Sequence, residues 1–235
     1  MSFSRQSVAF LNELARHNAK PWFENNRARY EEFIRQPLRD LVEEMDVRLA
    51  RIAPEIIGDV KRSPFRIYRD VRFSADKSPY KTHASCWFFH RDGAHNVGRE
   101  AIGGGAGFYF EFSPKRSFVG GGLWMPPRSA LNRLREAIVE DQRGFERAIV
   151  DPAVKRRFGG LSDEAILKRT PRGYAPDHPA SHWLRHQSFV LGRELTTAQA
   201  TSARLPALLE RDFEMMLPLV RWLNRALGLV PAERR

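Results

Sequence analysis

The 235-residue sequence contains one cysteine, Cys86. A single cysteine excludes an internal disulfide and a zinc site built from several cysteines, and it is typical of proteins from a reducing compartment. The sequence contains no run of 18 apolar residues, the length that predicts a transmembrane helix. Residues 1–10 also lack the charged lead and apolar stretch of a secretory signal. We therefore expect a cytoplasmic protein without a membrane partner.

Several common catalytic and cofactor motifs are missing. There is no Gly-Lys-Ser/Thr phosphate loop, no GxGxxG after a strand and no GxSxG turn. His178, His182 and His186 recur every four residues, a spacing that lets two imidazoles share a helix face. No glutamate accompanies them as in a metalloprotease helix, so we predict neither a metal nor a cofactor. Nothing in the sequence indicates the oligomeric state.

Lysine is also scarce, since only seven of the 39 basic residues are lysine and the rest are arginine. The formal net charge is nevertheless +11. Residues 61–81 hold seven basic and two acidic side chains, the largest local excess in the chain. A concentrated excess favours an anion-binding face, although it does not separate nucleic acid from a small phosphate ester.

The basic stretch, KRSPFRIYRDVRFSADKSPYKTH at residues 61–83, alternates like a half-buried strand from residue 65 to 73. Its apolar side is Phe65, Ile67, Val71 and Phe73, and its polar side is Arg66, Tyr68, Asp70 and Arg72. Arg69 breaks the apolar series, through a bulge or because the strand runs past the core. Side chains on one face repeat at about 7 Å, so this row can hold a phosphate or a carboxylate.

A turn is predicted at residues 74–79 from their Ser, Asp and Pro content. It would bring Lys77, Tyr80, Lys81 and His83 to the end of the basic strand. The alternative is a solvated basic hairpin whose surface ion pairs contribute about 0 to 1 kcal/mol each.

Five segments resemble one known family. They are RIYRDVRFSADKSPYKTH at 66–83, PWFENNRARYEEF at 21–33, GGGLWMPP at 120–127, FGGL at 158–161 and PDHPA at 176–180. In this order and spacing the chain resembles the family catalogued as domain of unknown function 2461, found in bacteria and some fungi. The resemblance implies one α+β domain and no established activity. It also implies that the charged and tyrosine residues of the basic stretch act as a set.

The segment GFYFEFSPKRSFVGGGLW predicts a hairpin in which Phe108, Phe110 and Phe112 face the core while Tyr109 and Glu111 face away. Glycine within a strand marks close approach by a ligand or another backbone. If the face of Tyr109 and Glu111 is also the face of Arg66 and Tyr68, the sheet presents a polar floor whose acids are Glu111 and Asp70, and Gly121 leaves room above it. Alternatively, the glycines accommodate Trp124 or a packed helix.

The predicted fold is a single α+β domain over residues 1–235. A mostly antiparallel sheet of about four to six strands would carry the N- and C-terminal helices on one face. Apolar spacing predicts helices at residues 4–17, from Pro21, from Pro37 and at 202–227, with a kink at Pro218.

The leading functional hypothesis is recognition of a phosphate- or carboxylate-bearing ligand by planar guanidinium groups and lysines. The predicted ligand-binding residues are Arg66, Tyr68, Arg69, Arg72, Asp76, Lys77, Tyr80, Lys81, Gly121 and Trp124. An enzyme would use Asp70 or Glu111 as general base and His83 as acid. A nucleic-acid-binding module would stack bases on Trp87, Trp124 or Phe89. A structural alternative is that Asp70 and Asp76 neutralise the arginines.

Overall fold

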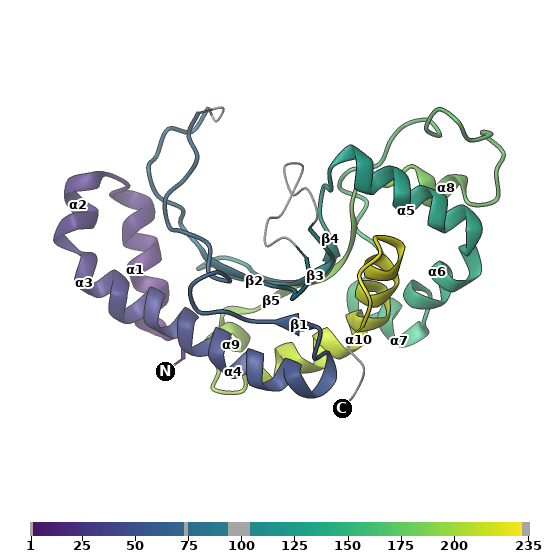
Figure 1. Ribbon diagram of the computed structural model, residues 1–235. Coiled ribbons are helices and arrows are strands. Elements are labelled where there is room, and N and C mark those ends of the chain that lie inside the picture. Colours follow the sequence, from purple (N-terminus) through teal and green to yellow (C-terminus); the bar gives the residue numbers. More distant parts are fainter. Residues whose placement is uncertain (1, 73–74, 94–103, 232–235) are drawn as a thin grey trace.

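A computed structural model describes residues 2–72, 75–93 and 104–231. Five antiparallel strands form one sheet whose order follows the chain. The strands are β1 (Ile56–Ile57), β2 (Ala84–His90), β3 (Gly107–Phe112), β4 (Ser117–Leu123) and β5 (Phe189–Leu195). The helices lie on one side of this sheet and at its ends (Figure 1). The predicted α+β class and antiparallel sheet are confirmed.

The N-terminal helices begin as the sequence predicts. Helix α1 (Arg5–Arg16) is capped by Ser4, whose hydroxyl accepts a hydrogen bond from the Gln6 amide. Helix α2 (Lys20–Asn25) has Pro21 in its first turn. Pro37 lies in the first turn of α4 (Gln36–Ile52), as predicted, although α3 (Arg27–Tyr30) and the π-helical turn η1 (Glu31–Arg35) lead into α4 directly. A widened turn just before a proline accommodates its ring and its missing amide hydrogen.

The C-terminal helix α10 (Leu205–Ala226) packs under the sheet together with α4 and the short helix α9 (Thr197–Ala200) (Figure 1). Phe213 of α10 stacks on Phe108 of β3, with 4.4 Å between ring centroids. Phe3, just before α1, stacks on Phe112 at 4.1 Å. The helix continues through Pro218. The inward side chains of the strands and these helices thus share one continuous core.

The remaining helices gather at the β5 end of the sheet (Figure 1). They are α5 (Arg128–Glu140), α6 (Gln142–Ile149), α7 (Pro152–Phe158) and α8 (Ser181–Leu184). Asp212 of α10 is fully buried there and forms ion pairs of 2.7 Å with Arg157 of α7 and Arg193 of β5. This carboxylate joins three elements at one point.

The basic stretch departs from the sequence prediction, because residues 65–72 form no strand. Isolated bridges join Pro64 to Cys86 and Tyr68 to Tyr80. The predicted Phe73 position lies outside the described residues. Prolines 64 and 79 donate no backbone hydrogen bond, and a ribbon of two segments without a third neighbour is only marginally regular. The described residues 64–72 and 75–81 instead rise from the sheet as an extended arm (Figure 1), which we call the basic arm.

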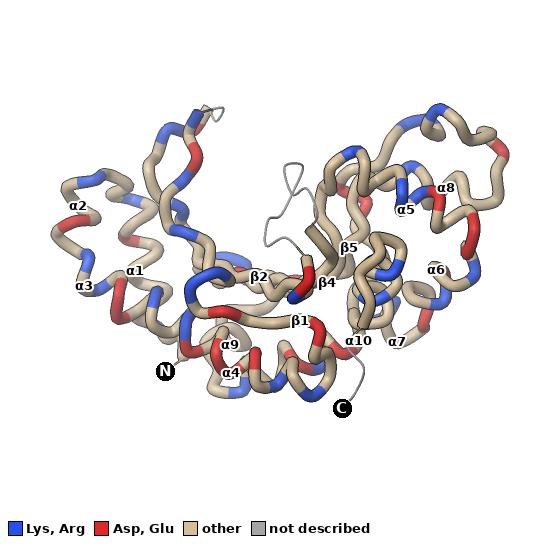
Figure 2. The backbone as a smooth tube through the Cα atoms, in the orientation of Figure 1, with Lys and Arg blue, Asp and Glu red and all other residues tan. Residues whose placement is uncertain are grey.

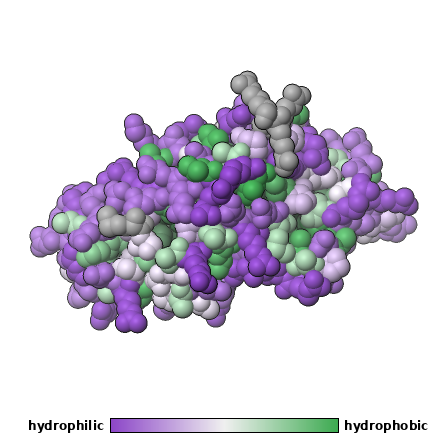
Figure 3. Space-filling model, turned by 90° about the horizontal axis from the view of Figure 1, so that it is seen from below, coloured by the Kyte–Doolittle hydropathy of each residue, from purple (hydrophilic) through white to green (hydrophobic). Residues whose placement is uncertain are grey.

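The helical side of the molecule, seen from below, offers little hydrophobic surface. Hydrophobic residues appear there as separate small areas among hydrophilic ones (Figure 3). None of the described helices is long and apolar enough to cross a membrane. The opposite side of the sheet is different, because a cavity lies over it.

Candidate functional site

The candidate site lies on the sheet face that points away from α10. Strand register puts Ser85 opposite Glu111, Trp87 opposite Tyr109, and Tyr109 opposite Gly120. Paired residues in antiparallel strands point to the same face. These positions alternate with the core-facing Phe108, Phe110 and Phe112, so the predicted outward direction of Tyr109 and Glu111 is correct.

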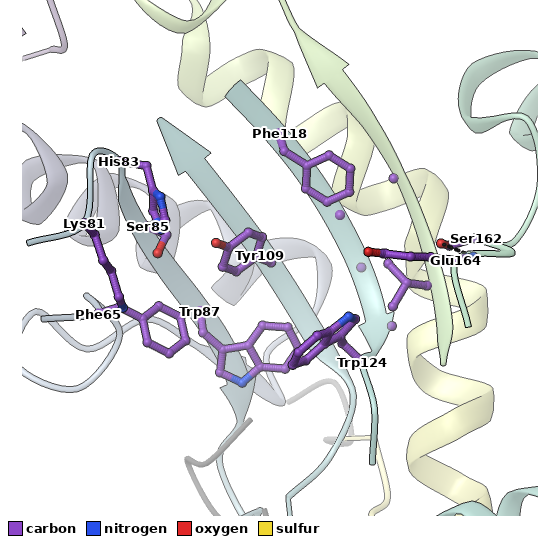
Figure 4. Close-up of a pocket in the computed structure, with 15 residues that line it drawn as sticks. Phe65, Lys81, His83, Ser85, Trp87, Tyr109, Phe118, Trp124, Ser162 and Glu164 are labelled. Carbon is purple, nitrogen blue, oxygen red and sulfur yellow. Dashed lines mark hydrogen bonds between the residues drawn. The ribbon is translucent and has the colours of Figure 1, made fainter. Parts of the chain in front are cut away.

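This face forms the floor of a cavity of about 610 Å³, a volume suited to a small organic molecule (Figure 4). Five aromatic residues line it, namely Phe65, Trp87, Tyr109, Phe118 and Trp124. The polar side chains around it are Lys81, His83, Ser85, Ser162 and Glu164. The cavity is therefore largely apolar, with polar groups at its ends.

The glycines of β4 and β5 have two different roles. A Cβ on Gly120 would lie 2.8 Å from the ring of Phe118, and one on Gly192 would also collide with it, so these two glycines let that ring lie over the strands. A Cβ on Gly121 would instead meet Phe108 at 2.8 Å and the sulfur of Met216 at 2.9 Å. Gly121 is therefore required by the packed helix, as in the second sequence alternative, and it lines the cavity through its backbone alone.

Lys81 stands at one end of the cavity, where the basic arm meets the sheet (Figure 4). Its Nζ lies 5.4 Å from the ring centroid of Phe65, a cation–π contact. Burial, followed by repulsion from Arg66, lowers the pKa of Lys81. Lys81 forms no ion pair with any residue that the structure describes. An ammonium group that has lost water without gaining a carboxylate is a favourable partner for an anion.

His83 and Glu111, two of the predicted catalytic residues, come together beside Lys81. His83 Nε2 lies 3.7 Å from Glu111 Oε2, and the Tyr109 hydroxyl donates to the same oxygen at 2.7 Å. Burial lowers the pKa of His83, against the attraction of Glu111. The imidazole is therefore neutral near pH 7, which suits a proton acceptor better than the predicted acid. Burial, with the nearby Glu111 charge, raises the pKa of Tyr109 and keeps its phenol protonated.

Asp70, the third predicted catalytic residue, is not part of this group. It forms an ion pair of 2.6 Å with Arg72 on the exposed arm, and hydrogen bonds from Arg72 lower the pKa of Asp70 to about 2. Arg69 pairs with Asp76, and the Lys77 ammonium donates to the Val71 carbonyl at 2.9 Å. Figure 2 shows these alternating charges along the arm. The predicted arm residues thus largely satisfy one another.

Tyr80 anchors the basic arm to the N-terminal helices. Its side chain is only 2% exposed and stacks on Phe23 at 4.1 Å between ring centroids. Its backbone exchanges two hydrogen bonds with the Asn18 side chain, of 2.9 and 3.0 Å. Tyr68, the other predicted tyrosine, lies against Tyr80 and is 47% exposed. Because it is buried, Tyr80 has no surface for a ligand, and it is not one of the proposed ligand-binding residues.

Of the predicted base-stacking residues, Trp87 and Trp124 line the cavity. Phe89 is buried, with the Arg62 guanidinium 4.7 Å from its ring centroid. Six lining residues with side chains were not predicted from the sequence, namely Phe65, Ser85, Phe118, Ser162, Glu164 and Val190. For Ser85 and Phe118, the alternation of side chains along their strands could have indicated that they face the same side as Tyr109.

The histidine series lies elsewhere. His182 and His186 line a second cavity of about 360 Å³ beside α7 and α8. Their ring centroids are 5.6 Å apart. Within the described ranges no three His, Cys, Asp or Glu side chains are grouped so that they could hold a metal ion.

Comparison with protein families matches residues 6–222 to the conserved hypothetical proteins of DUF2461. The match covers most of the chain, so the protein belongs to this family. Comparisons with curated proteins and with solved structures find no match.

Proposed function

We propose that the protein binds a small organic anion with an aromatic or apolar body in the cavity over the sheet. The observation that carries this proposal is Lys81, a half-buried cation without an ion-pair partner among the described residues, at one end of an aromatic-lined cavity. The anionic group, a carboxylate or phosphate, would contact Lys81. Its body would lie over the floor made by Tyr109 and Trp87.

Two further features support an organic anion over a bare inorganic one. Five aromatic rings give a ligand apolar area to cover, at about 25 cal/mol for each Å² removed from water. Trp124 is 52% exposed, which is unusual for so large an apolar side chain and leaves it available for a ligand to cover. Inorganic phosphate alone would use neither feature.

The basic arm supports the site indirectly. Arg69 and Arg72 are neutralised by Asp76 and Asp70, whereas Arg66 forms no ion pair within the described ranges and lies close enough to lower the pKa of Lys81. Arg66 thus adds positive potential at the Lys81 end. A polyanion lying along the arm, the nucleic-acid alternative, would have to displace the internal ion pairs.

The proposal predicts a charge- and pH-dependent affinity for 4-methylphenylacetate. At pH 8 it should bind about tenfold more tightly than the uncharged 2-(4-methylphenyl)ethanol, the gain of a charge-assisted contact. At pH 6 the acid is still ionised, and the difference in affinity between the acid and the alcohol should be larger than at pH 8. Burial lowers the pKa of His83 in the free protein, and a bound anion would raise it, so binding takes up a proton. Isothermal titration of both compounds at both pH values measures this.

Equal affinity for the acid and the alcohol at both pH values would overturn the proposal. So would displacement of the acid by a short single-stranded oligonucleotide whose own affinity falls steeply with salt, because that result would make nucleic acid the ligand of this face.

A further inference from the structure

We infer that the ligand of this cavity also carries a positive charge, placed at the end remote from its anionic group and bound by Glu164 with Phe118 and Trp124. This inference rests on the proposed function for the anionic end alone. It narrows the ligand class from organic anions to dipolar molecules with well-separated charges.

The backbone places Glu164 at the β5 end of the cavity. The Ser162 amide donates to the Val190 carbonyl at 2.8 Å, so this segment lies along β5. Val190 is paired with Gly122, and Trp124 follows two residues later in the chain. The Ala165 carbonyl accepts from the Gln187 amide at 2.9 Å, which holds the segment on the other side of Glu164. Figure 4 shows Glu164 on the side of the cavity opposite Lys81.

The carboxylate of Glu164 has no cation of its own. It forms no ion pair with a residue of the described ranges, although 39 residues of the chain are basic. Phe118 of β4 and Trp124, just after β4, also line the cavity and lie on the side away from Lys81 (Figure 4). An ammonium group gains from the faces of aromatic rings and from a nearby carboxylate together. The combination at this end therefore matches a cation in the same way that Lys81 matches an anion.

The distance between the two ends selects the ligand further. Lys81 leads into β2, and Glu164 lies in a segment beside β5, the edge strand, so four strand spacings separate the two backbones. At about 4.8 Å a spacing this is roughly 19 Å between backbones, and the side chains reach inward from both. The charges of an α-amino acid are too close together to contact both ends. An ω-amino acid with an aromatic or extended apolar body between its charges fits.

The test compares 4-(aminomethyl)phenylacetate with 4-methylphenylacetate, which differ only in the ammonium group. The dipolar compound should bind wild-type protein on the order of tenfold more tightly. Glu164→Gln should remove this advantage while leaving the affinity for 4-methylphenylacetate unchanged. Asp163→Asn is the matched control, because Asp163 is the preceding exposed carboxylate but lines the second cavity. It should keep the full advantage.

The two proposals fail in different ways. If 4-methylphenylacetate binds and the ammonium group adds nothing, or if its advantage survives in Glu164→Gln, the dipolar inference is wrong and the anion site stands. If neither compound binds wild-type protein, the proposed function itself is overturned. Melting temperatures of both variants should equal that of wild type, since both side chains are exposed.

Discussion

Replacing Asp212 by alanine is expected to lower the free energy of unfolding by about 3 kcal/mol, measured by urea denaturation at pH 7. The carboxylate has 0% exposure and receives paired contacts from Arg157 and Arg193. Removing one member of a buried ion pair leaves its partners without compensation, at a cost of about 3 to 5 kcal/mol. We expect the lower value of this range because the Arg157 side chain is 34% exposed and can be hydrated when the carboxylate is removed.

The matched control is Glu210→Ala in the same helix. Glu210 also contacts two arginines, Arg48 at 2.5 Å and Arg51 at 3.0 Å, but its side chain is 19% exposed and Arg51 is largely in solvent. Its loss should cost about 1 kcal/mol or less. If Asp212→Ala were no more costly than Glu210→Ala, Asp212 would not be the residue that fixes α7 and β5 to α10. The loop that carries Glu164 follows α7, so the β5 end of the cavity depends on this contact.

Tyr80→Ala is expected to cost about 3 to 5 kcal/mol, as for other fully buried aromatic side chains. The substitution removes the ring that stacks on Phe23 and supports Tyr68, at the point where the basic arm meets the N-terminal helices. Below its unfolding temperature the variant should also bind 4-methylphenylacetate more weakly. Lys81 and Phe65 belong to the arm, and their positions depend on this anchor. Thermal and urea unfolding measure the loss of stability, and isothermal titration measures the loss of affinity.

Tyr68→Ala controls for the loss of a tyrosine from the same arm. Tyr68 is 47% exposed, and its replacement should change stability by about 1 kcal/mol or less. A Tyr80→Ala variant as stable as Tyr68→Ala would contradict the anchoring role. It would then favour the original expectation that Tyr80 serves a ligand.

The local sequence was sufficient to predict the direction of side chains in a strand that packs on one face only. It was also sufficient to predict the start of a helix that has a side-chain cap. Phe108, Phe110 and Phe112 alternate with Tyr109 and Glu111, and that period alone gives the direction of each side chain. Ser4 begins α1 because its hydroxyl replaces a missing backbone partner. Both features depend on neighbours within a few residues.

The basic arm has the same alternation and yet forms no strand. Period two predicts a strand only if a partner supplies its hydrogen bonds, and residues 65–72 have one neighbouring segment with isolated bridges. The sequence alone does not show that a second neighbouring segment is missing. For the same reason Asp70 was grouped with Glu111, although the arm carries Asp70 away from the sheet.

Glu164 could not have been found from its local sequence. It enters the cavity because Ser162 pairs with Val190, a contact across 28 positions of the chain. The segment around it has neither helical nor strand periodicity. Positions of this kind are set by long-range packing, here of α7 against β5 and α10 through Asp212.

The most direct test of the anion site is the affinity of Lys81→Met for 4-methylphenylacetate, measured by isothermal titration beside Lys77→Met. Methionine keeps the apolar contact with Phe65 but removes the charge, whereas Lys77 lies on the arm outside the cavity. We expect Lys81→Met to bind 4-methylphenylacetate about tenfold more weakly and 2-(4-methylphenyl)ethanol with unchanged affinity. Lys77→Met should bind both compounds as the wild type does. Wild-type affinity in Lys81→Met, or an equal loss in both variants, would contradict the proposed anion site.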